Sequence, residues 1–446
     1  GSGVTIGYAG IATFRSVRID VGDSLQNTGI GQETLNSLTT GAQNVAIGYQ
    51  ALEANTTALR SVAVGVYALS SNTTAVNNTA LGYAALKDNT TGATNTALGN
   101  YALNVNTTGA SNVAVGYAAL DANTTGNYNT GLGVDALTAN TTASENTAVG
   151  YNALDANTTA DNNTAIGRNA LYVNTTGTTN VAIGNYALDA NTTQSDNTAI
   201  GYNACGAANG AGQLAAVGGY ALCDVTTGNR NTALGYYAGK TITTGDDNIA
   251  IGAHSLDANT TGGYNIAIGS HALGKSNANL NVAIGYYTLE ENTTGADNTA
   301  VGSEALTANT TADANVAIGK QALYTNTTGH SNTAVGSWAL YTNNTTSWNT
   351  AVGYKAAFTY AGNEIDAFGF EALKLCTTGI RNAAFGAYTL DACTTGVYNN
   401  AFGYAALSAV TTGRDNSAFG SQALLVNTAD GNSAFGYFSW NANTTV

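Results

Sequence analysis

Short segments in which bulky and small apolar residues alternate recur along nearly the whole chain. Each has the form Asn-(Thr/Val)-Ala-(Ile/Val/Leu)-Gly, and is followed by Tyr-x-Ala-Leu and then by Asn-Thr-Thr-Gly. β-Branched residues at alternate positions are typical of a strand, and Thr-Thr-Gly is typical of a turn. The Gly that closes the alternating segment recurs 25 times from Gly31 to Gly436, and successive residue numbers in this series mostly differ by 17, and three times by 16.

This period predicts the fold class. We number each repeat from 1 to 17, with Asn44 at position 1 and Gly48 at position 5. A period of about 17 residues is too short for helical or leucine-rich repeats and fits one coil of a β-solenoid. Charged residues make up only 9% of the chain and hydrophobic residues 44%, which disfavours both a helical bundle and disorder. The sequence therefore predicts an all-β solenoid of about 25 coils.

The two faces of the predicted strand differ in bulk. Positions 2 and 4 carry Thr, Val, Ile or Leu, whereas position 3 is Ala and position 5 is Gly. We expect the bulky side chains to fill the solenoid core, and the Ala/Gly face to let the backbone of a neighbouring chain come close. The alternative is a thin single-chain solenoid in which Ala and Gly fit a narrow interior.

Position 4 changes to Phe near the end of the chain, while position 2 shrinks to Asp, Ala, Asn or Ser. Compensating changes in volume indicate that positions 2 and 4 share one compartment. The sequence thus divides into a cap or transition segment at 1–26, repeats with an Ile/Val/Leu core at 27–353, and repeats with a Phe core at 354–446 that stop within a repeat. The Phe residues are Phe368, Phe385, Phe402, Phe419 and Phe435.

Other positions predict columns of identical residues that stack from coil to coil. Leu at position 9 is expected to point inward. Position 12 is usually Asn but can be Val, Ile or Cys, and this exchange indicates an inward column in which Asn side chains hydrogen-bond to one another. The expected columns are Asn55, Asn72 and Asn89 at position 12, and Gly48, Gly65 and Gly82 at position 5.

Charge and cysteine content exclude several classes of function. The net charge is −14, so the chain lacks the basic surface that nucleic acids require. The chain has no run of 18 apolar residues, so we expect no insertion of this segment into a membrane. Four cysteines do not make a disulfide scaffold. Cys376 and Cys393 fall at position 12 of adjacent coils, where a disulfide is compatible with the distance but geometrically demanding.

The repeat resembles that of known surface fibres. Asn44-Val-Ala-Ile-Gly-Tyr and Asn163-Thr-Ala-Ile-Gly resemble the repeats in heads of trimeric autotransporter adhesins, and the longer form is similar to shaft repeats of phage tail-fibre-like proteins. The resemblance covers residues 27–446 and implies a homotrimer of left-handed parallel β-rolls on a cell or virion surface. The adhesin-head repeat is shorter than the repeat of this chain, so the match to that family is not complete. The expected handedness and trimer number come from the resemblance alone.

Candidate sites are few. His254 and His271 occupy position 7 of adjacent coils and should stack, but they are weak metal candidates because a site needs three or four ligands. Acidic residues recur at position 10, where they place charge on the surface. Tyrosines at positions 6 and 7 either cover the core edge or form a platform for glycans. These tyrosines are Tyr49, Tyr67, Tyr83, Tyr101, Tyr117 and Tyr151.

The sequence contains no nucleophile motif and no phosphate-binding glycine loop, and its carboxylates recur rather than form a unique pair. We therefore expect no enzyme, no cofactor and no resident metal. The favoured function is a structural or adhesive fibre shaft outside the cell, which associates with itself and contacts a cell-surface glycan or protein. The alternatives are a monomeric solenoid that binds ice or crystals through its Thr columns, and a subunit of a self-assembling extracellular filament.

Overall fold

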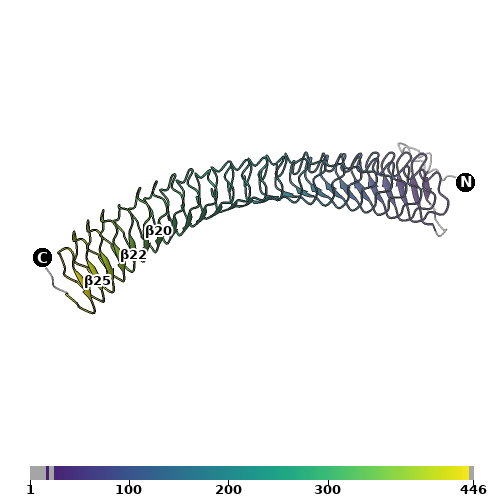
Figure 1. Cartoon of the computed structure of the whole chain (residues 1–446). Coiled ribbons are helices and arrows are strands. Elements are labelled where there is room, and N and C mark those ends of the chain that lie inside the picture. The colour runs from purple at the N-terminus through teal and green to yellow at the C-terminus, as the bar shows by residue number, and fades with distance from the viewer. Residues whose placement is uncertain (1–16, 20–24, 441–446) are drawn as a thin grey trace, which may run out of the picture. The chain divides into compact units, whose positions relative to one another are not determined.

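The computed structural model describes residues 17–19 and 25–440. It confirms the predicted fold, because the chain is an all-β parallel solenoid of about 24–25 turns with about 17 residues per turn. The coils form two compact units, Gly1–Gly219 and Tyr220–Val446. In each unit every coil contributes one three-residue strand, and the strands of successive coils lie side by side (Figure 1).

The described residues of unit 1 form thirteen strands: β1 (Val17–Ile19), β2 (Thr28–Ile30), β3 (Val45–Ile47), β4 (Val62–Val64), β5 (Thr79–Leu81), β6 (Thr96–Leu98), β7 (Val113–Val115), β8 (Thr130–Leu132), β9 (Thr147–Val149), β10 (Thr164–Ile166), β11 (Val181–Ile183), β12 (Thr198–Ile200) and β13 (Ala215–Val217). Strands β2 to β13 pair in parallel with identical repeat positions opposite each other, as Thr79 pairs with Thr96. Strand β1 instead runs antiparallel to β2. Most of the predicted cap at 1–26 lies outside the described residues.

Unit 2 contains the other thirteen strands: β14 (Thr232–Leu234), β15 (Ile249–Ile251), β16 (Ile266–Ile268), β17 (Val282–Ile284), β18 (Thr299–Val301), β19 (Val316–Ile318), β20 (Thr333–Val335), β21 (Thr350–Val352), β22 (Asp366–Phe368), β23 (Ala383–Phe385), β24 (Asn400–Phe402), β25 (Ser417–Phe419) and β26 (Ser433–Phe435). All thirteen stack in parallel and in register. The three shorter steps of the repeat leave this register intact, since Ile266 still pairs with Val282 and Thr350 with Asp366.

The strand faces are the reverse of those predicted. Ala at position 3 is fully buried inside the coil, as at Ala80 and Ala97, whereas positions 2 and 4 point outward. Leu81 and Leu98, both at position 4, are 44% and 42% exposed. The expected Ile/Val/Leu core is therefore wrong, and so is the expected Phe core after residue 354. The interior beneath the strand is too narrow for more than a methyl group, which is why position 3 is Ala in almost every coil.

The interior of the coil is built mainly from three kinds of side chain at five repeat positions. Ala at positions 3 and 8 and Leu at position 9 supply its apolar part, and Asn at positions 1 and 12 supplies its polar part. The inward orientation of Leu at position 9 and of Asn at position 12 is confirmed, as Leu103 and Asn106 are fully buried. The inward Asn at position 1 was not predicted.

The Asn at position 12 forms the predicted ladder from Asn72 onward, whereas Asn55, the first member expected, has a buried Nδ2 without a hydrogen-bond partner. Asn106 Nδ2 donates to Asn89 Oδ1 of the preceding coil at 2.8 Å, and Asn123 Nδ2 donates to Asn106 Oδ1 at 2.8 Å. Asn106 Nδ2 also donates to the carbonyl oxygen of Gly109 at 2.9 Å, which fixes the turn of its own coil. A buried amide is tolerated only when its hydrogen bonds are made, and here the neighbouring coil supplies the partner.

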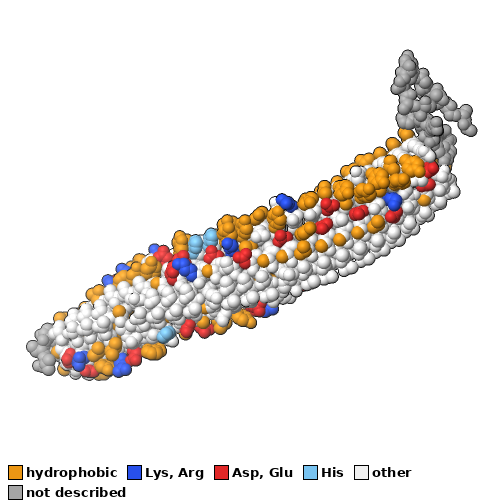
Figure 2. Space-filling model, turned by 90° about the horizontal axis from the view of Figure 1, so that it is seen from above, with side chains coloured by type: hydrophobic (Ala, Val, Ile, Leu, Met, Phe, Trp, Pro, Cys, Tyr) orange, Lys and Arg blue, Asp and Glu red, His pale blue; other side chains and the backbone are white. Residues whose placement is uncertain are grey.

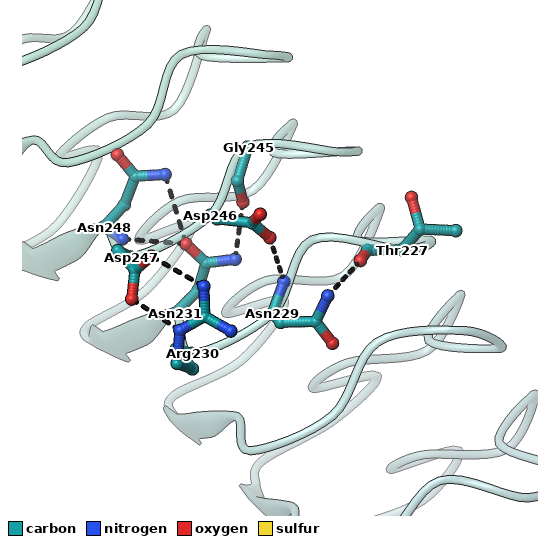
Figure 3. Close-up of polar contacts among 8 residues, drawn as sticks. All are labelled: Thr227, Asn229, Arg230, Asn231, Gly245, Asp246, Asp247 and Asn248. Carbon is teal, nitrogen blue, oxygen red and sulfur yellow. Dashed lines mark hydrogen bonds and ion pairs between the residues drawn. The ribbon is translucent and has the colours of Figure 1, made fainter.

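The Asn at position 1 forms a second ladder, shown in Figure 3 for Asn231 and Asn248. The backbone N–H of Asn248 donates to Asn231 Oδ1 at 3.0 Å, and Asn231 Nδ2 donates to the carbonyl oxygen of Gly245 at 2.7 Å. Each Asn therefore joins the start of a strand to the turn of its own coil and to the next coil. These columns explain how buried asparagines stabilise the stack.

The first ladder ends where its sequence changes. Position 12 is Ala208 in the coil after Asn191, and Asn191 Oδ1 is a buried oxygen without a hydrogen-bond partner. Because Ala208 has no side-chain amide, no Nδ2 group is present in this coil to donate to Asn191 Oδ1. Apolar residues occupy position 12 in runs of adjacent coils, as with Ala208, Val225 and Ile242. Such runs limit the loss of hydrogen bonds to the ends of each run.

Gly at position 5 is required by contact between coils. Gly99 has a φ of 142°, and a Cβ at this position would lie 2.2 Å from the carbonyl oxygen of Gly116 in the next coil. The same relation holds from coil to coil, as for Gly48 and Gly65 at 2.4 Å. The predicted Gly column is confirmed, and the backbone that approaches it belongs to the next coil of the same chain rather than to another chain.

Other turn residues also adopt left-handed backbone conformations. Leu103 at position 9 has a φ of 51°, and Tyr101 at position 7 has a φ of 61°. A non-glycine residue in this region is strained by roughly 1–2 kcal/mol. Both N–H groups donate to neighbouring coils, Tyr101 to Tyr83 at 2.9 Å and Leu103 to Ala119 at 3.0 Å. The conformation is therefore maintained by the coils on either side.

Within residues 17–19 and 25–440, no helix has the length and hydropathy needed to cross a membrane.

We predict that Gly99→Ala lowers the denaturation midpoint, because strain at this φ costs about 1–3 kcal/mol and the added methyl group meets the Gly116 backbone. Gly131→Ala is the matched control. It restores the usual Ala of position 3, where the added Cβ would lie 3.3 Å from the Ala136 oxygen, and should change stability by less than about 1 kcal/mol. Urea denaturation followed by circular dichroism measures both; equal losses would contradict the proposed role of position 5.

We predict that Asn106→Val and Asn123→Val are each destabilising, by about 1–3 kcal/mol, because each leaves buried partners unpaired. The double variant should cost less than the sum, since the bond between the two amides is lost only once. Thr108→Val, an exposed change in the same coil, should have an effect below about 0.5 kcal/mol. Strict additivity in a double-mutant cycle would show that the ladder bond is not energetically significant.

Candidate functional site

The outer face of the strand stack carries exposed apolar side chains in both units. It is formed by positions 2 and 4 of the strands, and we call it the outer strand face. Among strands β2–β26, Asp366 is the one charged residue on this face. Position-4 side chains such as Leu132 and Leu234 are 44% and 48% exposed. Figure 2 shows that hydrophobic side chains gather in rows along the stacked coils instead of scattering over the surface.

Five Phe side chains form a ring column on this face in strands β22–β26. Their centroids are 4.7 to 5.1 Å apart and their planes differ by 2–7°. Beside them, position 2 holds small side chains such as Ala383 and Ser417. The inferred shared compartment of positions 2 and 4 is confirmed, but it lies outside the coil. The column consists of Phe368, Phe385, Phe402, Phe419 and Phe435.

A second aromatic row follows the strand in unit 1. Tyr49, Tyr83 and Tyr117 occupy position 6 and alternate with Tyr67 and Tyr101 at position 7. Adjacent rings meet edge to face, with centroids 5.3–5.9 Å apart and interplanar angles of 73–83°. The position-6 rings are 36–52% exposed. The structure thus brings five of the six predicted tyrosines into one row, and Tyr151 occupies position 6 two coils farther on.

His254 and His271 stack as predicted, with centroids 5.1 Å apart and planes 6° from parallel. Tyr287 continues the column at 4.8 Å from His271. His254 Nδ1 lies 2.9 Å from Asp257 Oδ2. Within the described part of the chain, no group of three or more His, Cys, Asp or Glu side chains is arranged to hold a metal ion. The rings of His254, His271 and Tyr287 thus form one stacked column.

All four cysteines are buried thiols, and no disulfide joins them. Cys376 and Cys393 replace Asn in adjacent coils of the position-12 column. Hydrogen bonding to Cys393, together with burial, raises the pKa of the Cys376 thiol. Burial raises the pKa of Cys223 to about 12. Cys223 and Cys376 therefore stay protonated and act as small apolar side chains. The hydrogen bond with Cys376 lowers the pKa of the Cys393 thiol.

The Thr columns are mostly used within the stack. At position 13, Thr107 Oγ1 donates to the carbonyl oxygen of Thr124 in the next coil at 3.0 Å, and Thr124 repeats this contact with Thr141 at 2.9 Å. Position 14 is exposed, as at Thr108. One of the two Thr columns is therefore committed to coil stacking, and the ice-binding alternative stays a prediction.

Charged side chains pair across coils at position 17. Arg230 reaches Asp247 through two hydrogen bonds, of 2.7 Å from Nε and 2.8 Å from Nη2 (Figure 3). The hydrogen bond from Arg230 lowers the pKa of the Asp247 carboxyl. Arg381 and Glu364 form a similar pair at 2.6 Å. Exposed pairs of this kind contribute little to stability.

The carboxylates at position 10 are less exposed than predicted. Burial raises the pKa of Asp121, Asp155 and Asp189 above its usual range, and it does the same for Glu290 and Asp391. These side chains lie against the turn instead of extending into solvent. The predicted column of Glu53, Asp121, Asp155 and their equivalents is thus a half-buried acidic column.

We predict that the position-10 carboxylates make stability depend on pH. A carboxyl whose pKa is raised in the folded state binds its proton more tightly there than in the unfolded chain, so stability increases as the pH falls through the raised pKa toward the ordinary carboxyl pKa of about 3.9. Asp121→Asn/Asp155→Asn/Asp189→Asn should denature at higher urea concentration at pH ~7 and gain less on acidification. An unchanged pH dependence in this variant would show that other groups are responsible.

The chain matches no family model, and no curated protein matches it.

Proposed function

We propose that the chain is a structural or adhesive shaft of a surface fibre outside the cell, in which copies of the chain associate through the outer strand face. The observation that carries the proposal is the exposure of a continuous apolar row on a coil whose interior is already filled. Ala97 and Leu103 are fully buried within their own coils, whereas Leu98 remains 42% exposed. Large contiguous apolar surfaces on soluble proteins commonly mark interfaces.

A second copy of the chain is the partner that this face suits best. In strands β2–β26 position 4 of this face is always Ile, Val, Leu or Phe, so a copy offers an apolar row with the same spacing. Burial of apolar area contributes about 25 cal/mol per Å², and this contribution accumulates along many coils. The resemblance to trimeric fibres favours three copies and left-handed coils.

Strands β22–β26 add a constraint on association. The Phe column projects from position 4, and the small residues at position 2 leave a depression beside it, so a neighbouring copy could pack a ring against position 2. Asp366 at the start of this region is exposed. An unpaired carboxylate is costly to bury, so the association must leave position 2 of this coil in contact with water or with a cation.

The test is the mass of the native particle, measured by light scattering coupled to size exclusion. A mass of three times 44.9 kDa supports the trimeric shaft. A mass that grows with concentration would favour the filament alternative, which adds chains without closing. A mass of 44.9 kDa at all concentrations would overturn self-association.

We predict that Leu81→Asp/Leu98→Asp shifts the native mass toward that of one chain, because association would have to bury two charges on the outer strand face. Thr91→Asp/Thr108→Asp is the matched control, since it adds the same charge to the same two coils at the exposed position 14. The control should keep the native mass. Retention of the oligomer by the Leu variant, with circular dichroism unchanged, would place the interface elsewhere.

A further inference from the structure

Four exposed tyrosines of unit 1, from Tyr49 to Tyr151, follow a period of two coils. Tyr202, 48% exposed at the same repeat position, lies three coils after Tyr151. Tyr49, Tyr83, Tyr117 and Tyr151 all occupy position 6, and each is two repeats after the one before it. Their exposed fractions are 36%, 42%, 52% and 50%. The intervening coils place other residues at this position, so the period is a property of this surface and not of the fold. The intervening residues are Val66, Asn100 and Val134.

The spacing of this row selects one class of ligand. Parallel coils stack at about 4.8 Å, so two coils span about 9.6 Å. In an extended β-1,4-linked polysaccharide, each sugar ring is turned over relative to the one before it, and the same ring face recurs once per disaccharide. A disaccharide unit has a length close to that of two coils. A glycan chain lying along the coils would therefore present equivalent sugar faces to successive position-6 tyrosines.

The row is also chemically suited to sugars. A Tyr ring offers an apolar face for the C–H groups of a pyranose and a hydroxyl for hydrogen bonding. The position-7 rings hold the row in place, since Tyr67 meets Tyr49 at 5.6 Å and 77° and meets Tyr83 at 5.9 Å and 83°. Aromatic side chains that are already packed lose little conformational freedom on binding.

The charges beside the row favour an uncharged glycan. Glu33 accepts a hydrogen bond from Gln50 Nε2 at 2.6 Å, next to Tyr49. The backbone N–H of Asp135 donates to the carbonyl oxygen of Tyr117 at 3.0 Å. The Asp135 carboxylate interacts electrostatically with those of Asp121 and Asp155 in the adjacent coils. Negative charge along this side opposes acidic polysaccharides and leaves neutral chains unaffected.

We infer that the position-6 tyrosine row of unit 1 binds a neutral β-1,4-linked polysaccharide chain along the solenoid. This binding goes beyond self-association, because it uses the turn after the strand and not strand positions 2 and 4. The two properties can fail separately: loss of the oligomer would not remove the row, and loss of glycan binding would not alter the native mass.

Sedimentation of the full chain with insoluble polysaccharides tests the inference. The native chain should be retained on microcrystalline cellulose or chitin, and much less on insoluble starch, which has α-linkages, or on alginate beads, which are acidic. Tyr83→Ala/Tyr117→Ala should weaken the association with cellulose or chitin by about tenfold or more, a loss of about 1.4 kcal/mol. The control Tyr128→Ala/Tyr264→Ala removes two tyrosines that are 66% and 60% exposed at position 17, and should bind like the native chain.

Two further variants keep the test decisive. Tyr83→Phe/Tyr117→Phe retains the rings and should keep most of the binding, whereas Tyr83→Leu/Tyr117→Leu retains bulk without a ring and should lose it. If the Ala variant does not keep the native mass and the circular dichroism spectrum of the native chain, the binding of the Leu variant is compared with that of the native chain instead. Absence of binding to both β-1,4-linked supports, equal binding to starch, or equal losses in the position-6 and position-17 variants would overturn the inference.

Discussion

The structure depends on the stacking of identical residues from successive coils directly on one another. Asn at positions 1 and 12 can be buried because the same residue in the next coil supplies or accepts its hydrogen bond. Leu103 and Tyr101 can adopt left-handed conformations because their N–H groups reach adjacent coils. Gly99 is required because Gly116 lies directly against it. No coil could satisfy these groups alone, so stability comes from neighbours, as in other repeat proteins.

The narrow interior determines what the outside carries. Each coil encloses Ala, Leu and Asn, and these residues leave no room for a β-branched or aromatic side chain beneath the strand. The bulky residues of the strand must therefore point outward, even though they are the most apolar in the repeat. An apolar exterior on a filled coil is an unfavourable surface for an isolated chain in water. The filled interior of each coil therefore leaves apolar side chains exposed, and the proposed association of several chains would bury them.

The sequence predicted the coil length, the strand in each coil, and the inward Leu and Asn at positions 9 and 12. It did not predict which strand face is inside, because alternation separates two faces without identifying the interior. One signal was available: Asp366 and Asn400 share their face with the Phe column, and such polar residues belong on a surface. The left-handed φ of Leu103 could not be predicted, because Leu has no intrinsic preference for it and neighbouring coils impose it.

Separation of inward and outward positions allows the surface to vary while the fold is kept. Position 2 accepts Thr, Val, Ile, Ala, Asn, Ser and Asp, and position 6 accepts Tyr, Val, Asn and Arg, because none of these side chains enters the coil. Positions 1, 3, 5 and 9 vary far less. The turn accepts coils that are one residue shorter without loss of strand register, as between Ile266 and Val282. The fold therefore does not require Tyr at position 6 of every second coil from Tyr49 to Tyr151, and this local pattern is consistent with the inferred ligand at the surface.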